Sequence, residues 1–153
     1  YFAGARLPVQ ARHVARVVCL WSLFTGLVLS LTMWIVQAAV IRRFVPAAAV
    51  APFIPAWRIA LVFQPISALA FATDGIHWGL GDFAFLRNVV LAATTCAAGL
   101  LFVLHTTDGF ALSWIWTITG VWLFIRAAAG LLRIWPGTAN SPIRQIGSEL
   151  SYE

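Results

Sequence analysis

The stretch VVCLWSLFTGLVLSLTMWIVQAAVI, residues 17–41, contains no charged side chain. A helix rising about 1.5 Å per residue over this length covers more than the roughly 30 Å hydrocarbon core of a bilayer. The apolar core of a secretory signal peptide has only about 7 to 15 residues, so the stretch is too long to be one. It is therefore predicted to be a transmembrane helix.

The composition of the whole chain supports this prediction. Of its 153 residues, 61% are hydrophobic and 10% are charged, whereas soluble domains are about half apolar and a quarter charged. A water-soluble domain is thereby excluded. Three further apolar runs follow the first, and the sequence predicts an all-α membrane protein with four transmembrane helices: 17–41, 57–80, 88–104 and 110–132.

The segments between and beyond these runs divide the chain. The connection after the first run holds Pro46, Pro52 and Pro55, which deny a continuous helix its amide donors, so residues 45–55 are predicted to be a bent loop. The expected parts are a basic entry segment (1–16), the four-helix transmembrane part (17–135) and a tail predicted to be disordered (136–153).

The arginines predict the orientation in the membrane. Four spans place both termini on one side, and cytoplasmic loops carry an excess of basic residues. Seven arginines lie on the side of the termini, against Arg42, Arg43 and Arg58 on the other, so both termini are expected in the cytoplasm. Ten arginines without a lysine are typical of a GC-rich bacterial genome, which suggests a bacterial inner membrane. The seven are Arg6, Arg12, Arg16, Arg87, Arg126, Arg133 and Arg144.

Several functional classes lack their residues. The net charge of +5 would suggest nucleic-acid binding in a soluble chain, but these arginines stand singly or in pairs beside apolar runs, so no nucleic-acid partner is expected. Asp74 and His77 supply only two metal ligands, and neither a metal nor a cofactor is predicted. The motifs of hydrolases, ATPases, zinc proteases and thioredoxin-like proteins are absent from the sequence, so an enzyme is not expected.

The second apolar run carries the candidate functional residues. Asp74 is expected within or at the margin of the hydrocarbon, where a carboxylate costs at least about 2.5 kcal/mol. It is interpreted either as a proton or cation site or as a hydrogen-bonding group between helices. Gln64 and Pro65 predict a kink with a polar face that contacts substrate, or a structural kink satisfied by Ser67 or another helix. Gly75 and Gly79 have the spacing of a helix-packing pair.

The same run resembles a known family. Its sequence reads Gln64-Pro65-Ile66-Ser67-Ala68-Leu69-Ala70-Phe71-Ala72-Thr73-Asp74-Gly75, followed by Gly79 and Asp82. This is similar to the pattern QP-x-x-A-x-x-F-x-x-DG-x-x-x-G-x-x-D in the tenth helix of the multidrug and toxic compound extrusion (MATE) transporters of the DinF-type branch. Residues 11–16 resemble the entry to the ninth helix, and residues 114–126 resemble the twelfth.

The resemblance implies that the four helices correspond to helices nine to twelve of a twelve-helix transporter. The expected function is export of cationic or amphiphilic small molecules, coupled to protons or sodium ions. The expected partners are the lipid bilayer and the amino-terminal helices of the same transporter. Asp74, Gln64 and Ser67 become candidate substrate or cation cavity residues, where Ser67 replaces a cation-binding carboxylate of other branches. Pro65, Gly75 and Gly79 are the kink and packing candidates.

Two other hypotheses remain open at the level of sequence. A free-standing four-helix structural or assembly subunit would account equally for the spans and their orientation. It would not account for the long motif in the second run. An intramembrane enzyme that uses Asp74 and His77 would need a further catalytic group at matching depth, and the sequence offers none.

Overall fold

A computed structural model describes residues 8–106, 111–135 and 141–142. Over these residues the chain forms four long helices and no strand, and one short 3-10 helix precedes the second long helix. All four helices are long and apolar enough to cross a membrane. The prediction of an all-α, multi-pass membrane protein is therefore confirmed. The helices are α1 (Pro8–Phe44), η1 (Ala47–Ala49), α2 (Val50–Leu80), α3 (Phe83–His105) and α4 (Leu112–Ile134).

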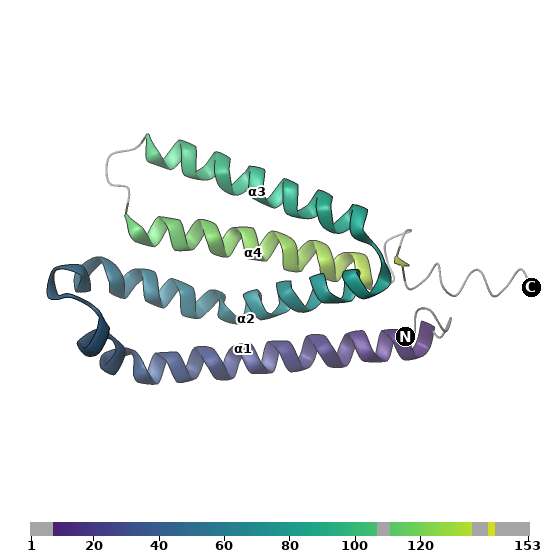
Figure 1. Cartoon of the computed structure of the whole chain (residues 1–153), viewed down its shortest axis with the longest axis horizontal. Coiled ribbons are helices and arrows are strands. Elements are labelled where there is room, and N and C mark those ends of the chain that lie inside the picture. Colours follow the sequence, from purple (N-terminus) through teal and green to yellow (C-terminus); the bar gives the residue numbers. More distant parts are fainter. Residues whose placement is uncertain (1–7, 107–110, 136–140, 143–153) are drawn as a thin grey trace, which may run out of the picture.

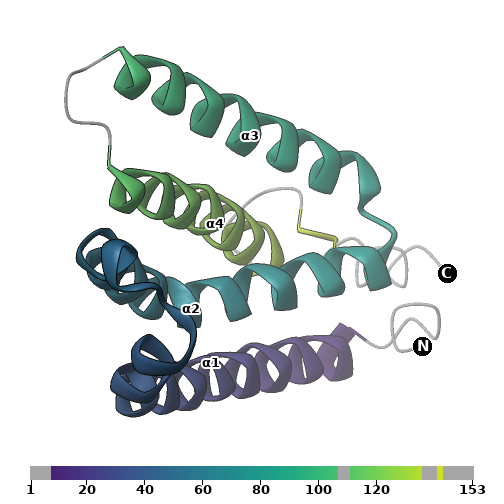
Figure 2. The same cartoon turned by 60° about the vertical axis from the view of Figure 1, so that its left-hand side comes forward.

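The central helix α2 packs against both α1 and α4, and α3 packs mainly against α4 (Figure 1). Successive helices run in opposite directions, so the start of α1, the α2–α3 connection and the end of α4 lie at the same end of the bundle (Figures 1 and 2). Large apolar side chains such as Trp21, Ile35 and Phe102 are exposed on the outer surface. Such a surface suits hydrocarbon rather than water.

The loop predicted for residues 45–55 is wrong in its second half, because α2 already begins at Val50. Pro52 is the third residue of this helix, a position whose N–H has no partner within the helix, so proline is tolerated there. Pro55 lies farther inside. The helix α1 also extends through most of the predicted entry segment, and α3 begins at Phe83, earlier than residue 88. The predicted disordered tail lies outside the described residues except for residues 141–142.

Glycines permit the close approach of α2 and α4. A β-carbon added to Gly120 of α4 would lie 2.3 Å from the ring of Phe63 on α2. One added to Gly130 would lie 2.7 Å from Thr73. Both distances are shorter than any real contact, so only hydrogen at these two α4 positions allows this packing.

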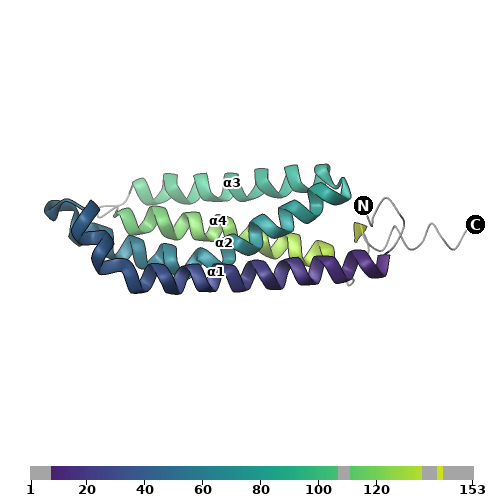
Figure 3. The ribbon, with the colours of Figure 1, turned by 60° about the horizontal axis from the view of Figure 1, so that its bottom comes forward.

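Pro65 interrupts the hydrogen-bond ladder of α2, and α2 changes direction near its middle (Figure 3). A proline has no N–H to donate to the carbonyl four residues earlier, which here belongs to Leu61. The hydroxyl of Ser30 on α1 donates to this carbonyl oxygen at 2.8 Å. Another helix, and not Ser67, therefore satisfies the carbonyl that the kink exposes. Gly26 of α1 supports the contact, since a β-carbon there would lie 2.8 Å from the α-carbon of Pro65.

Replacing Ser30 with alanine should destabilise the bundle. The variant leaves the carbonyl of Leu61 without a donor in an apolar environment, and interhelical hydrogen bonds in membranes contribute about 0.6 kcal/mol on average and up to about 1.7. We expect a loss in this range, measured by denaturant titration in detergent micelles. Thr32→Val is the matched control, because within the described part of the chain the hydroxyl of Thr32 bonds only to the carbonyl of Val28 in its own helix. Equal effects of the two variants would contradict the role of Ser30.

Candidate functional site

Asp74 of α2 forms an ion pair with Arg126 of α4. Arg126 is 7% exposed and the side chain of Asp74 is 15% exposed, so both charged groups are largely buried between the helices. A charge at this depth is stable only when it is paired or hydrated. The pairing supports the interpretation of Asp74 as a group that joins two helices. Its role as a proton or cation site remains a prediction.

Aromatic rings complete the environment of Arg126. The guanidinium carbon lies 4.2 Å from the ring centroid of Trp122 and 5.6 Å from that of Phe71. Both distances are within the range of cation–π attraction. Trp122 is fixed in turn by α3, where the hydroxyl of Thr94 accepts a hydrogen bond from its indole nitrogen at 3.2 Å. The guanidinium is thus held by one carboxylate and two rings.

A second charged cluster lies one turn farther along α2. His77 is buried, with Nε2 3.3 Å from the carbonyl oxygen of Gly130 and Nδ1 3.4 Å from a carboxylate oxygen of Asp82. Arg133 of α4 donates to the same carboxylate, with Nε at 3.0 Å. Asp82 reaches this position because Gly81, at a φ of 73°, ends α2 and turns the chain. The cluster ties the α2–α3 connection to α4.

Gln64 and Ser67 line a cavity of about 270 Å³ between α2 and α4. The two residues are three positions apart, and Asp74 follows Ser67 by seven, so all three lie on one side of α2. Asp74 itself is not among the lining residues of this cavity. The structure therefore brings Gln64 and Ser67 together and places the Asp74–Arg126 pair beyond them, behind Phe71 and Trp122.

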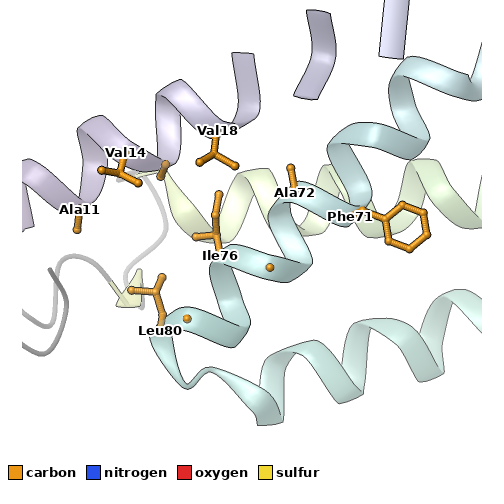
Figure 4. Close-up of a pocket in the computed structure, with 10 residues that line it drawn as sticks. Ala11, Val14, Val18, Phe71, Ala72, Ile76 and Leu80 are labelled. Atoms are coloured by element: carbon orange, nitrogen blue, oxygen red, sulfur yellow. The ribbon is translucent and has the colours of Figure 1, made fainter. Parts of the chain in front are cut away.

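Gly75 and Gly79 face a different space. They line an apolar groove of about 390 Å³ between α1 and α2, opposite residues such as Val14 and Val18 (Figure 4). A β-carbon added to either glycine would meet nothing within 4 Å among the described residues. The close interhelical contacts are made instead by Gly26, Gly120 and Gly130. A packing role for Gly75 and Gly79 stays a prediction.

Sequence reasoning missed the role of Arg126. The sequence assigns Arg126 to the basic residues on the cytoplasmic side, whereas in the structure its side chain is buried against α2, eight residues before α4 ends at Ile134. The signal was present, because Asp74 and Arg126 are single opposite charges within otherwise apolar runs. Ser30 gave no such signal in the sequence. Its partner, the carbonyl of Leu61, is brought close only by the packing of α1 against α2 at Pro65.

The Asp74–Arg126 pair should show strong thermodynamic coupling. Removing one partner leaves a buried unpaired charge, so Asp74→Asn and Arg126→Gln should each lower the unfolding free energy by about 3–5 kcal/mol. The double variant should lose much less than the sum. The measurement is a double-mutant cycle from denaturant titration in micelles. Arg58→Gln is the control, because Arg58 is exposed and pairs with no carboxylate among the described residues. Its guanidinium carbon lies 5.9 Å from the ring centroid of Trp34. Additive losses would contradict the pair.

Comparison with known proteins gives partial matches. No family model matches the chain, and no solved structure does so significantly. The chain is similar to three proteins of Arabidopsis thaliana. It is 33% identical to Protein DETOXIFICATION 44, chloroplastic, over 56% of this chain and 16% of that protein. It is 40% identical to Protein DETOXIFICATION 42 and 31% identical to Protein DETOXIFICATION 43, in each case over 49% of this chain and 14% of the relative.

The matched region is therefore about half of this chain and at most 16% of the length of each relative. These similarities agree with the motif in α2 and with the four apolar helices. Together they support placement of this multi-pass membrane chain with the MATE family of detoxification transporters.

Proposed function

We propose that this chain is part of a cation-coupled exporter of multidrug and toxic compounds, of the DinF-type branch of the MATE family. The similarity to the DETOXIFICATION proteins is the observation that carries the proposal. The α2 motif supports the branch and the correspondence of α1–α4 to helices nine to twelve. The protein acts as a transporter, and not as an enzyme, on amphiphilic or cationic molecules, with protons or sodium ions as the coupling ions.

The side of α2 that faces α4 is the candidate transport site. Gln64 and Ser67 supply hydrogen-bonding groups to the cavity, and the Asp74–Arg126 pair lies beyond its end. A charged pair between two helices can exist in a closed and an open arrangement, which is what alternating access needs. In this proposal Asp74 exchanges Arg126 for a coupling cation during the cycle.

The proposed location is a bacterial inner membrane with both termini in the cytoplasm. Arg12, Arg16, Arg87 and Arg133 lie at the end of the bundle shared by the start of α1 and the end of α4, against Arg42, Arg43 and Arg58 at the other end. Without the buried Arg126, the described arginines number four at the shared end and three at the other, an excess of one in the direction that this orientation requires.

Cells that carry the complete gene should exclude dyes in an ion-dependent manner. We expect lower accumulation of ethidium or of the uncharged dye Nile red than in a deletion strain. A proton uncoupler, or the removal of sodium, should abolish the difference, because one of these gradients supplies the free energy. The measurement is the rate of fluorescence increase in whole cells, with a strain re-expressing the gene as a control. Equal accumulation with and without the gene would contradict export.

The size of the native product tests whether the four helices act within a larger transporter. With an epitope tag after Glu153 at the chromosomal locus, we expect a band about three times the 16.7 kDa of this chain, since four of twelve helices are represented. Detection of the tag in membranes after solubilisation is the measurement. A band at the size of this chain would contradict the twelve-helix proposal and favour the four-helix subunit.

A further inference from the structure

The cavity between α2 and α4 combines aromatic walls with a polar side. Its aromatic lining consists of Phe63 and Phe71 from α2 and Trp116 and Trp122 from α4. None of its ten lining residues is ionisable. The volume of about 270 Å³ lies just below the roughly 300–1,000 Å³ of sites for drug-sized ligands, which favours a compact molecule. Flat aromatic ligands match such walls by ring stacking.

Polar groups that lack partners face this cavity. Among the described residues, the side chains of Gln64 and Ser67 make no hydrogen bond to the protein, although both lie in a transmembrane helix. Thr119 uses its hydroxyl hydrogen on the carbonyl of Ile115 at 2.8 Å, which leaves its oxygen able to accept. A ligand with a hydrogen-bond donor or acceptor at its edge can bond to these half-buried groups, which lie on helices surrounded by apolar side chains.

The charges near the cavity oppose a cationic ligand. Phe71 and Trp122 line the cavity and also contact the guanidinium of Arg126, so these rings already hold a positive charge. The nearby carboxylate, Asp74, is neutralised by the same guanidinium. A permanently charged ligand would lose its hydration without gaining a free counter-charge.

We propose that this cavity binds an uncharged, flat aromatic molecule that forms hydrogen bonds with Gln64 and Ser67, and that Arg126 disfavours cations there. The inference rests on the proposed function only in treating the bound molecule as an exported one. Within the amphiphilic and cationic range proposed above, it assigns this cavity to the uncharged compounds.

The test compares two molecules of nearly equal shape and different charge, acridine and N-methylacridinium. Binding to the purified full-length gene product in lipid nanodiscs is measured by equilibrium dialysis at a mildly alkaline pH, where acridine is uncharged. We expect acridine to bind at least about tenfold more tightly. Tighter or equal binding of N-methylacridinium would overturn the proposal.

Variants locate the binding in the cavity. Ser67→Leu fills part of the space and removes a polar group, so acridine affinity should fall about tenfold. Gly99→Leu on α3 is the matched control, because a β-carbon there meets nothing within 4 Å and the residue does not line the cavity. Arg126→Gln should raise N-methylacridinium affinity several-fold, since Asp74 is then free. Unchanged acridine binding by Ser67→Leu would overturn the site even if Arg126→Gln does not fold.

Failure of the cavity proposal can be distinguished from failure of the proposed export function. Acridine binding that depends on Ser67, in a protein whose gene does not lower dye accumulation, supports the cavity and contradicts export. Gene-dependent exclusion of dyes, with acridine binding that does not depend on Ser67, supports export and overturns the cavity.

Discussion

The arrangement of α2 and α4 depends on one constraint, which is that a charge in an apolar bundle must have a partner. Asp74 and Arg126 meet this constraint across the two helices, and the rings of Trp122 and Phe71 surround the guanidinium. Because a lone charge is costly at this depth, the pair fixes both the rotation of each helix about its axis and their relative height. Gly130, one turn beyond Arg126, then allows the helices to approach closely.

A second constraint acts on the other side of α2. Pro65 removes one backbone donor, and in a membrane the carbonyl left behind must find a donor within the protein. Ser30 of α1 supplies this donor. The kink in α2 is therefore stabilised by a specific hydrogen bond to α1. Polar interactions thus hold both faces of α2: Ser30 on the side of α1, and Arg126 together with the His77–Asp82–Arg133 cluster on the side of α4.

The same interactions shape the cavity that we connect with transport. Gln64 lies at the kink, directly before Pro65, and Ser67 lies between the kink and Asp74. Both line the cavity beside α4, together with Phe71 and Trp122. The cavity therefore lies next to the Asp74–Arg126 ion pair, in which Asp74 can exchange Arg126 for another cation. A carboxylate held by a single guanidinium can accept another cation, whereas a hydrogen-bonded backbone cannot. The ion pair that we propose as the switch thus lies next to the cavity that we propose as the ligand site.

The sequence by itself determined the four spans, the fold class and the position of the polar helix, because long uncharged runs have few alternatives to crossing a bilayer. It also identified Asp74, Gln64 and Pro65 as unusual, since polar groups stand out in an apolar run. Only the tertiary structure decided that Arg126 pairs with Asp74 and that Ser30 donates to the carbonyl that Pro65 leaves free. It also decided that Gly75 and Gly79 line a groove, where a β-carbon would meet none of the described residues within 4 Å. These assignments depend on how the helices are rotated against one another, a property that arises from contacts between distant residues and not from local periodicity.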